Sequence, residues 1–346
     1  ISSLFSINPL FSLESSLFFW RFGLFSLSIW YLCDKHDEFL KYFTISLCCT
    51  FFVVIADAYY QYFTGFNILG YPYHESAGRL SGFFGDKLFL GNYLARLFPL
   101  LIGLILFYKK QSINNLILII ILFISVDIIT FLAGERVAVF YLLLSSSIMI
   151  VLINSWRLFR LISLIISAIL ILLILYFNSD IRNRMVNYTI SQINITSENY
   201  VPDHELLFTS AYKIFKDHQI IGSGPKMFRE LCRDEKYYFE NELYHSCSTH
   251  PHNIYLQLLA EVGIIGAMPV LYAFFYILYR LIQQFKNVLL VRALPLSSSE
   301  VCLYSAIIIS LWPIGTSMNF FSSHVNIITY LPIGFLLYSI NLNKND

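Results

Sequence analysis

Two histidines form the part of this 346-residue sequence best suited to acid–base chemistry. The segment reads His250-Pro251-His252-Asn253 and ends a charged stretch, directly before a long apolar run. Pro251 favours an extended residue before it and suits the first turn of a helix, so we expect His252 and Asn253 at the start of a membrane helix. A neutral imidazole there can accept a proton from a hydroxyl group. The alternative is an interfacial histidine with only a structural role.

Polar side chains continue along the same predicted helix. Asn253, Gln257 and Glu261 follow at i, i+4 and i+8, which gives one stripe about 12 Å long. A carboxyl at that depth should face the bundle interior or a cavity, either as part of a site or as a structural contact between helices. Paired histidines can also bind a metal, but no third ligand has convincing spacing, although His204 and His245 are present, so no metal is expected.

Three arginines are candidates for binding an anion. Arg79 and Arg136 fall in short loops on the side of the membrane that should be poor in cations, and Arg229 lies in the charged stretch. A guanidinium can hold phosphate or diphosphate through two parallel hydrogen bonds. The alternative is an ordinary ion pair, for which Asp86 and Glu135 are available to the first two.

The composition predicts an all-α polytopic membrane protein that must position these residues. Hydrophobic residues make up 57% of the chain and charged residues 13%, whereas soluble domains carry about 25% charged residues. The 23 basic and 22 acidic residues leave no excess for binding nucleic acid. Nine apolar stretches approach the length of a membrane helix: 16–33, 39–57, 88–108, 115–134, 136–153, 158–177, 254–282, 300–317 and 325–342.

The charges divide the chain into three predicted parts. Transmembrane helices occupy 1–177 and 253–346, and a large water-exposed loop occupies 178–252, which holds 18 of the 45 charged residues. Short loops rich in Lys and Arg alternate with poor ones, which orients the large loop outward. In a Gram-negative bacterium this is the periplasm, and the helices would cross the inner membrane.

Two cysteines of the large loop are expected to form a disulfide. Cys232 and Cys247 are the only cysteines there, and an oxidising compartment would let them pair. The closed loop of about 15 residues would contribute roughly 3 kcal/mol. Two free thiols are the alternative.

One buried ion pair is expected between membrane helices. Arg96 and Asp127 lie at similar estimated depths in antiparallel neighbouring spans. An unpaired charge within the membrane is expensive, so we expect these two side chains to contact each other.

Four motifs, in order along the chain, resemble the bacterial O-antigen ligase and O-antigen polymerase superfamily, and the resemblance runs from about residue 75 to 325. They are Arg79-x-Ser81-Gly82-Phe83 with Leu90-Gly91-Asn92-Tyr93-Leu94, the corner Gly134-Glu135-Arg136, the segment 215–225 with Gly222-Ser223-Gly224, and His250-Pro251-His252-Asn253 with Glu261-x-Gly263-x-x-Gly266. Glu135 stands where the family has Ser.

The resemblance implies a glycosyltransferase that needs no metal, nucleotide or other cofactor. A glycan on undecaprenyl diphosphate would be the donor, and lipid A-core or another glycan the acceptor. Arg79 and Arg136 would bind the diphosphate, and His252, with His250 sharing the role, would handle the proton of the acceptor hydroxyl. Many ligases carry an Arg early in the large loop, where this chain has His204. His204 or Arg229 would then supply that function.

Three functions remain open at this stage. A ligase and a repeat-unit polymerase use the same residues, so the sequence does not separate them. We slightly favour the ligase. The third is a transporter of lipid-linked glycans, which would explain polar residues within spans and predicts internal repeats and helices broken near the midplane.

Overall fold

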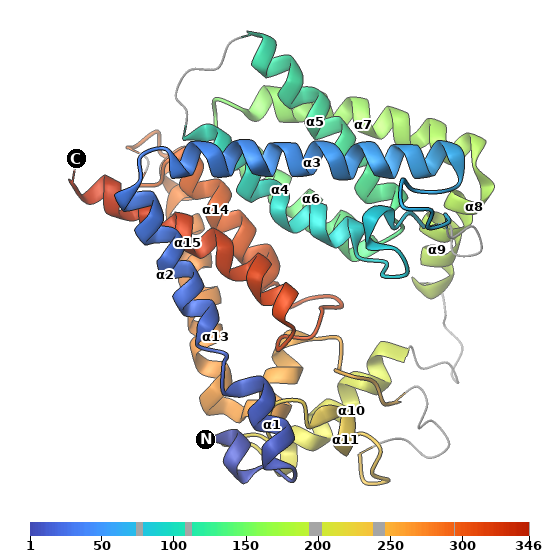
Figure 1. Ribbon diagram of the computed structural model, residues 1–346, viewed down its shortest axis with the longest axis vertical. Helices are drawn as coiled ribbons and strands as arrows, with labels where there is room; N and C mark the ends of the chain where they lie inside the picture. The colour runs from blue at the N-terminus through green and yellow to red at the C-terminus, as the bar shows by residue number, and fades with distance from the viewer. Residues whose placement is uncertain (74–78, 108–112, 194–202, 238–245, 294, 346) are drawn as a thin grey trace. The chain divides into compact units, whose positions relative to one another are not determined.

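The computed structural model describes residues 1–73, 79–107, 113–193, 203–237, 246–293 and 295–345, and Figure 1 shows its helices. Within these ranges the protein is helical and has no β-strand, so the all-α prediction is confirmed. His245 and parts of the stretch 178–252 lie outside the described residues. The division into 1–177, 178–252 and 253–346 stays a prediction.

The chain folds into two compact units, each built from several segments. The first unit contains Ile1–Ile29, Thr196–Arg280 and Ser310–Gly334, and the second contains Trp30–Ile195, Leu281–Ile309 and Phe335–Asp346. Three long helices contribute residues to both units: α2 (Arg21–Lys35), α13 (Ile254–Leu289) and α15 (Ser323–Asn345).

The second unit is a bundle of apolar helices. Its helices are α3 (Phe39–Thr64), α4 (Leu90–Leu106), α5 (Ile113–Leu132), α6 (Arg136–Leu152), α7 (Arg157–Phe177), α8 (Ser179–Arg182), η4 (Asn183–Asn187), α9 (Tyr188–Ile193) and most of α14 (Ser298–Ser310). Helix α4 is buried along nearly its whole length. The pairs α5 with α7 and α4 with α6 pack side by side.

The first unit combines short helices with parts of the long ones. Its short helices are η1 (Ser2–Phe5), α1 (Pro9–Ser16), α10 (Asp203–Asp217) and α11 (Phe228–Leu231). Leu207, Ala211 and Ile214 of α10 recur at helical spacing and form a buried cluster with Phe228 and Leu231 of α11. Helix α10 is therefore amphipathic, with its apolar face in this cluster.

All nine apolar stretches coincide with helices, but their lengths differ. Among the described residues, five helical segments are long and apolar enough to cross a membrane: Pro9–Lys35, Phe39–Thr64, Arg157–Phe177, Ile254–Leu289 and Ser323–Leu342. Four apolar helices are shorter: Leu90–Leu106, Leu116–Leu132, Arg136–Leu152 and Ser298–Ser310. The stretch expected at 300–317 ends as a helix at Ser310, because Pro313 and Gly315 follow. The protein is thus a multi-pass membrane protein with five clear candidate spans.

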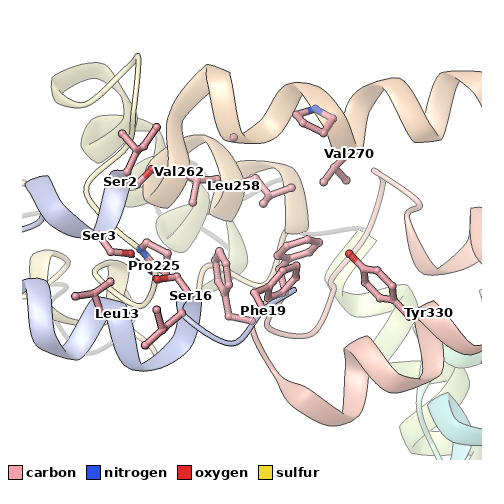
Figure 2. Close-up of a pocket in the computed structure, with 16 residues that line it drawn as sticks. Ser2, Ser3, Leu13, Ser16, Phe19, Pro225, Leu258, Val262, Val270 and Tyr330 are labelled. Carbon is pink, nitrogen blue, oxygen red and sulfur yellow. Dashed lines mark hydrogen bonds between the residues drawn. The ribbon is translucent and has the colours of Figure 1, made fainter. Parts of the chain in front are cut away.

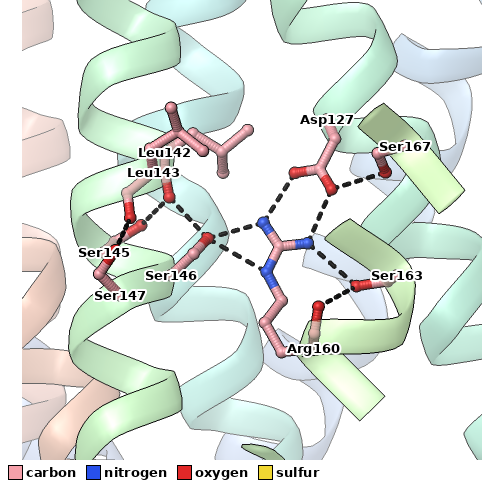
Figure 3. Close-up of polar contacts among 9 residues, drawn as sticks. All are labelled: Asp127, Leu142, Leu143, Ser145, Ser146, Ser147, Arg160, Ser163 and Ser167. Carbon is pink, nitrogen blue, oxygen red and sulfur yellow. Dashed lines mark hydrogen bonds and ion pairs between the residues drawn. The ribbon is translucent and has the colours of Figure 1, made fainter. Parts of the chain in front are cut away.

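The expected pair between Arg96 and Asp127 is wrong. Asp127 instead receives two hydrogen bonds from Arg160 of α7, at 2.7 and 2.8 Å, and both side chains are buried (Figure 3). Ser146 and Ser167 complete this network between α5, α6 and α7. Arg96 lies 4.9 Å from the centre of the Tyr141 ring.

Candidate active site

His252 occupies a strained backbone position at the start of α13. Its φ is +54°, in the left-handed region that L-residues rarely adopt. The Ser317 N–H donates to the His252 carbonyl at 2.6 Å, and the His250 ring lies 3.3 Å from the Ser317 carbonyl through Nε2. The segment 246–253 is therefore held against the residues that follow α14. Strained residues of this kind concentrate at functional sites.

Three imidazoles lie together in the first unit. The ring centres of His250 and His252 are 4.2 Å apart, and the His204 ring of α10 lies 5.5 Å from the His252 ring. His250 also contacts the Thr249 hydroxyl at 3.0 Å. The structure thus brings all three sequence-predicted histidines into one cluster.

The surroundings favour neutral imidazoles in this cluster. Burial is the main cause that lowers the pKa of His250 to about 4, and the nearby His252 and Arg229 lower it further. Burial, followed by repulsion from His204, also lowers the pKa of His252 below its usual 6.5. Since both values lie below 7, both rings can accept a proton at neutral pH.

The polar stripe of α13 is present, and each member has a definite partner. The Asn253 side chain caps the helix by accepting from the N–H groups of Tyr255 and Leu256, at 3.0 and 3.1 Å. Gln257 donates to Glu261 at 3.0 Å and to the Asn319 side chain at 2.8 Å. These contacts position α13 beneath the histidines.

Glu261 connects this stripe to the residue before Arg229. Its carboxylate accepts from the Phe228 N–H at 3.1 Å, and Glu261 is completely buried. The Arg229 guanidinium carbon lies 5.9 Å from the centre of the Phe11 ring, and its Nε has no hydrogen-bond partner among the described residues. The positive charge of Arg229 also contributes to lowering the pKa of the His250 ring.

A disulfide joins Cys232 and Cys247, as expected. Cys232 follows α11 directly, and Cys247 lies five residues before His252. The bond therefore ties the histidine segment to the helix that carries Arg229.

Helix α13 is broken at Gly263 and the segment 219–224 fills the break. Gly263 has φ +67° and ψ −171°. The N–H groups of Ser223 and Gly224 donate to the carbonyls of Ala260 and Glu261, at 2.9 and 2.8 Å. On the other side of the break, Ile264 and Ile265 donate to the carbonyls of Gln219 and Ile220 at 2.9 and 3.2 Å. These four bonds, which we call the backbone clasp, satisfy groups that the break would leave unpaired.

The clasp explains the glycines of the segment 222–224. A Cβ on Gly222 would lie 2.4 Å from the Glu261 carbonyl carbon, and a Cβ on Gly263 would lie 2.4 Å from the Ile220 oxygen. Neither position has room for a side chain. Gly222 therefore allows two backbones to approach closely, whereas a Cβ on Gly224 would lie 2.4 Å from the Ser6 Cβ.

In the second unit, Arg79 is held by the corner before α6. Its Nε donates to the Ala133 carbonyl at 3.2 Å and its Nη2 to the Leu88 carbonyl at 3.3 Å. Nη2 also lies 4.0 Å from a carboxylate oxygen of Glu135, so the expected alternative of an ion pair is present. Burial and the nearby Arg184 lower the pKa of Arg79, while Glu135 raises it.

Glu135 organises this corner. It accepts from the Gly91 N–H at 2.9 Å and from the Asn92 side chain, both at the start of α4. Burial raises the pKa of its carboxyl, and these hydrogen bonds together with Arg79 oppose that rise. Glu135, which stands where the family has Ser, therefore connects the Gly134-Glu135-Arg136 motif to the motif that contains Gly91 and Asn92.

Arg136 begins α6 and contacts the short helix α9. Its Nη1 donates to the Thr189 hydroxyl at 3.4 Å, and its guanidinium lies 5.4 Å from the centre of the Tyr188 ring. Arg184 of η4, which the sequence reasoning missed, lies near enough to Arg79 to lower its pKa. Its Nε is buried and has no hydrogen-bond partner among the described residues. Arg79, Arg136 and Arg184 thus all belong to this unit, and Arg184 lies near Arg79.

Gln61 and Asn67, also missed, support the Arg79 loop. The Gln61 side chain accepts from the N–H groups of Ser81 and Gly82, at 3.1 and 2.8 Å. Asn67 donates to the Gly82 carbonyl at 2.7 Å. The sequence does offer a signal for Gln61, because a side-chain amide within an apolar helix needs polar partners when it is buried.

Residues 116–271 match the family model described as O-antigen ligase. This match covers less than half of the chain, and it supports the resemblance to the O-antigen ligase and polymerase superfamily. The matched part contains Arg136, Arg229 and the histidine cluster, and it begins after Arg79. Members of the O-antigen ligase family are glycosyltransferase-like membrane enzymes that act on lipid-linked glycans. No curated protein matches the chain.

Proposed function

We propose that this protein transfers a glycan from undecaprenyl diphosphate to a hydroxyl of lipid A-core, at the outer face of a bacterial inner membrane. The observation that supports the proposal is His252: a half-buried imidazole with a lowered pKa, in a strained left-handed conformation within the matched family domain. The large loop would face the periplasm.

His252 would act as the base. As the acceptor oxygen attacks the anomeric carbon of the donor, its proton passes to the imidazole. A bond forms between that oxygen and the carbon, and the bond from the carbon to the diphosphate oxygen breaks. Undecaprenyl diphosphate leaves with the electron pair. His250 would share the role by orienting the hydroxyl, and burial together with repulsion from His204 would favour a neutral His252.

The arginines of the second unit would bind the diphosphate. Arg136 and Arg184 are the main candidates, because Arg79 already donates to two carbonyls and faces Glu135. We propose Arg79 as the residue that positions the corner on which Arg136 stands. Arg229 would add positive charge near the histidines.

In this proposal, the polar stripe of α13 does not contact the substrates but holds the start of the helix in position. Gln257, Glu261 and Asn319 bond to one another or to backbone, and Asn253 caps the helix. The break at Gly263 does not favour a transporter, because the clasp occupies the backbone groups that a broken helix would offer to an ion.

The decisive experiment is glycan transfer in vitro with the purified protein. Undecaprenyl-diphosphate glycan is supplied with lipid A-core in one reaction and without it in another. We expect product only with lipid A-core. Longer lipid-linked glycans without lipid A-core would make the protein a repeat-unit polymerase, and no transfer from several donors would refute the enzymatic proposal.

His252→Asn tests the base, because Asn tolerates the left-handed conformation but cannot take up the proton. We expect a loss of about 10²- to 10⁴-fold in the rate. The matched control is His36→Asn, which changes an exposed histidine outside the cluster and should retain full activity. Wild-type activity in His252→Asn would remove His252 from the mechanism.

Arg136→Lys tests diphosphate binding, because Lys keeps the charge and loses the bidentate geometry. We expect kcat/KM to fall by about 10- to 100-fold, the equivalent of one charge-assisted hydrogen bond. Arg182→Lys, on an exposed residue of α8, is the control. Equal activity of the two variants would leave Arg136 with a structural role only.

A further inference from the structure

Both nitrogens of the His250 ring have hydrogen-bond partners, and these partners fix its tautomer. Burial is the main cause that lowers the pKa of His250 to about 4, so the ring is neutral at pH 7 and carries one proton on nitrogen. Nε2 lies 3.3 Å from the Ser317 carbonyl oxygen, which can only accept, so the proton is on Nε2. Nδ1 is then the acceptor, and the Thr249 hydroxyl donates to it at 3.0 Å.

This tautomer leaves His250 poorly placed to act on the acceptor directly. A substrate hydroxyl that donates to Nδ1 must displace Thr249, and one that accepts from Nε2 must displace the Ser317 carbonyl. Each exchange would break a bond that the ring already makes. His250 therefore binds the protein rather than the acceptor, next to a His252 ring whose centre is 4.2 Å away.

Ser317 connects the His250 side chain to the His252 backbone. Its carbonyl accepts from the His250 ring, and its N–H donates to the His252 carbonyl at 2.6 Å. After His252, the Asn253 side chain donates to the Pro313 carbonyl of the same loop at 3.0 Å. A strained conformation such as that of His252 persists only where the surroundings hold it, and these three bonds do so.

The loop after α14 is a fixed support, because it packs on α13 and on the segment before α2. The Phe320 N–H donates to the Gln257 side chain at 2.9 Å. The Phe320 ring stacks on Phe19, with the ring centres 5.5 Å apart, and packs in one cluster with Leu258. Figure 2 shows Phe19 and Leu258 at a cavity that Phe320 also lines. This loop lies outside residues 116–271, so the family match does not include the support.

We propose that His250 is a positioning residue: held in one tautomer by Thr249, it keeps His252 in its left-handed conformation through Ser317. The inference rests on the proposed function, in which His252 is the base. His250 then orients the acceptor hydroxyl through His252 and transfers no proton of its own. Thr249 and the Ser317 backbone belong to the same support.

Substitutions of His250 separate support from proton transfer. In His250→Gln the side-chain amide can take the place of the Nε2–H and donate to the Ser317 carbonyl, but it cannot take up a proton. In His250→Leu that donor is lost. We expect kcat to fall by about 100-fold in His250→Leu, the effect of displacing a catalytic group by about 1 Å, and to recover to within about tenfold of the wild type in His250→Gln. Equal losses in both variants, or no loss in His250→Leu, would overturn the proposal.

Thr249 offers a milder test that leaves both histidines in place. Thr249→Val keeps the shape of the side chain and removes the donor to Nδ1, whereas the matched control Thr249→Ser keeps the hydroxyl. We expect kcat to fall about fivefold in Thr249→Val, the equivalent of one neutral hydrogen bond, and to recover most of this loss in Thr249→Ser. The same kcat in the two variants would contradict the proposal.

The tautomer of His250 can be measured without any substrate. Nuclear magnetic resonance is recorded on the purified protein in lipid bilayers, labelled with nitrogen-15 histidine, and the His250 signals are assigned by their absence from His250→Gln. At pH 7 we expect a directly bonded hydrogen at Nε2 and none at Nδ1, with a second tautomer in Thr249→Val. A proton on Nδ1 in the wild type would overturn the proposal. If the wild type transfers no glycan, the proposed function fails, and the spectrum still decides whether Thr249 and Ser317 fix the ring.

Discussion

Gly263→Ala should damage both stability and transfer, although residue 263 contacts neither substrate in our proposal. A Cβ at this position would lie 2.4 Å from the Ile220 oxygen and 2.5 Å from the Gly222 nitrogen. Apolar contacts are normally 3.5–4.0 Å, so the segment 219–224 must retreat by about 1 Å. The φ and ψ of Gly263 also fall in a region open essentially only to glycine, which costs about 1–3 kcal/mol for any other residue.

The retreat should break about two of the four clasp bonds, at about 1 kcal/mol each. The total loss is then about 3–5 kcal/mol of unfolding free energy. Because α13 begins at the histidine segment, a displacement of about 1 Å would also lower transfer by about 10²-fold. Thermal unfolding and glycan transfer of the purified variant measure the two effects.

Gly23→Ala is the control for this substitution. Gly23 lies in α2, and a Cβ there meets nothing within 4 Å, so stability should be unchanged or rise by up to about 1 kcal/mol. Gly222→Ala disturbs the clasp from its other side, and combining it with Gly263→Ala should cost less than the sum of the two. If Gly263→Ala unfolds at the temperature of the Gly23→Ala control and retains activity, the clasp does not hold α13 in place.

Three further predictions concern separate features. Asp127→Leu should lower the free energy of unfolding by about 3–5 kcal/mol because it leaves the Arg160 charge buried and unpaired. The double variant Asp127→Leu with Arg160→Leu should leave this free energy nearly unchanged. Unfolding of the purified variants in lipid measures both effects. The rate of transfer should be constant near pH 7 and should fall only below pH 6.5, as His252 gains a proton. His204→Gln should raise the pKa of His252 and move this fall to higher pH. An unchanged pH profile in His204→Gln would contradict the repulsion between the two histidines. Cys247→Ser should lower the unfolding free energy by about 3 kcal/mol, and an unchanged melting temperature would show that the disulfide does not stabilise the histidine segment.

The helices and much of the site could be predicted because they depend on local pattern. Long apolar runs must be helical in lipid, since each backbone polar group needs a partner within the segment. The stripe of Gln257 and Glu261 follows from the helical repeat alone. The pairing of Cys232 with Cys247 follows from there being only two cysteines in the stretch.

Contacts between distant elements could not be predicted in the same way. Estimating depth by counting residues from the span ends pairs Arg96 with Asp127, because Arg160 lies close to the start of its predicted span, 158–177. In the structure α7 begins at Arg157, and its Arg160 side chain reaches Asp127 on α5. Arg184 was missed for a related reason: nothing in its neighbours along the chain indicates that it approaches Arg79.

The disulfide has a consequence for the biogenesis of the protein. Cysteines pair only where the surroundings are oxidising, and the bond between Cys232 and Cys247 precedes His252 by a few residues. A newly made chain whose loop is still on the reducing side therefore lacks the link that restrains the histidine segment. With the outward orientation that we propose for the large loop, maturation of the histidine segment would be coupled to export of that loop.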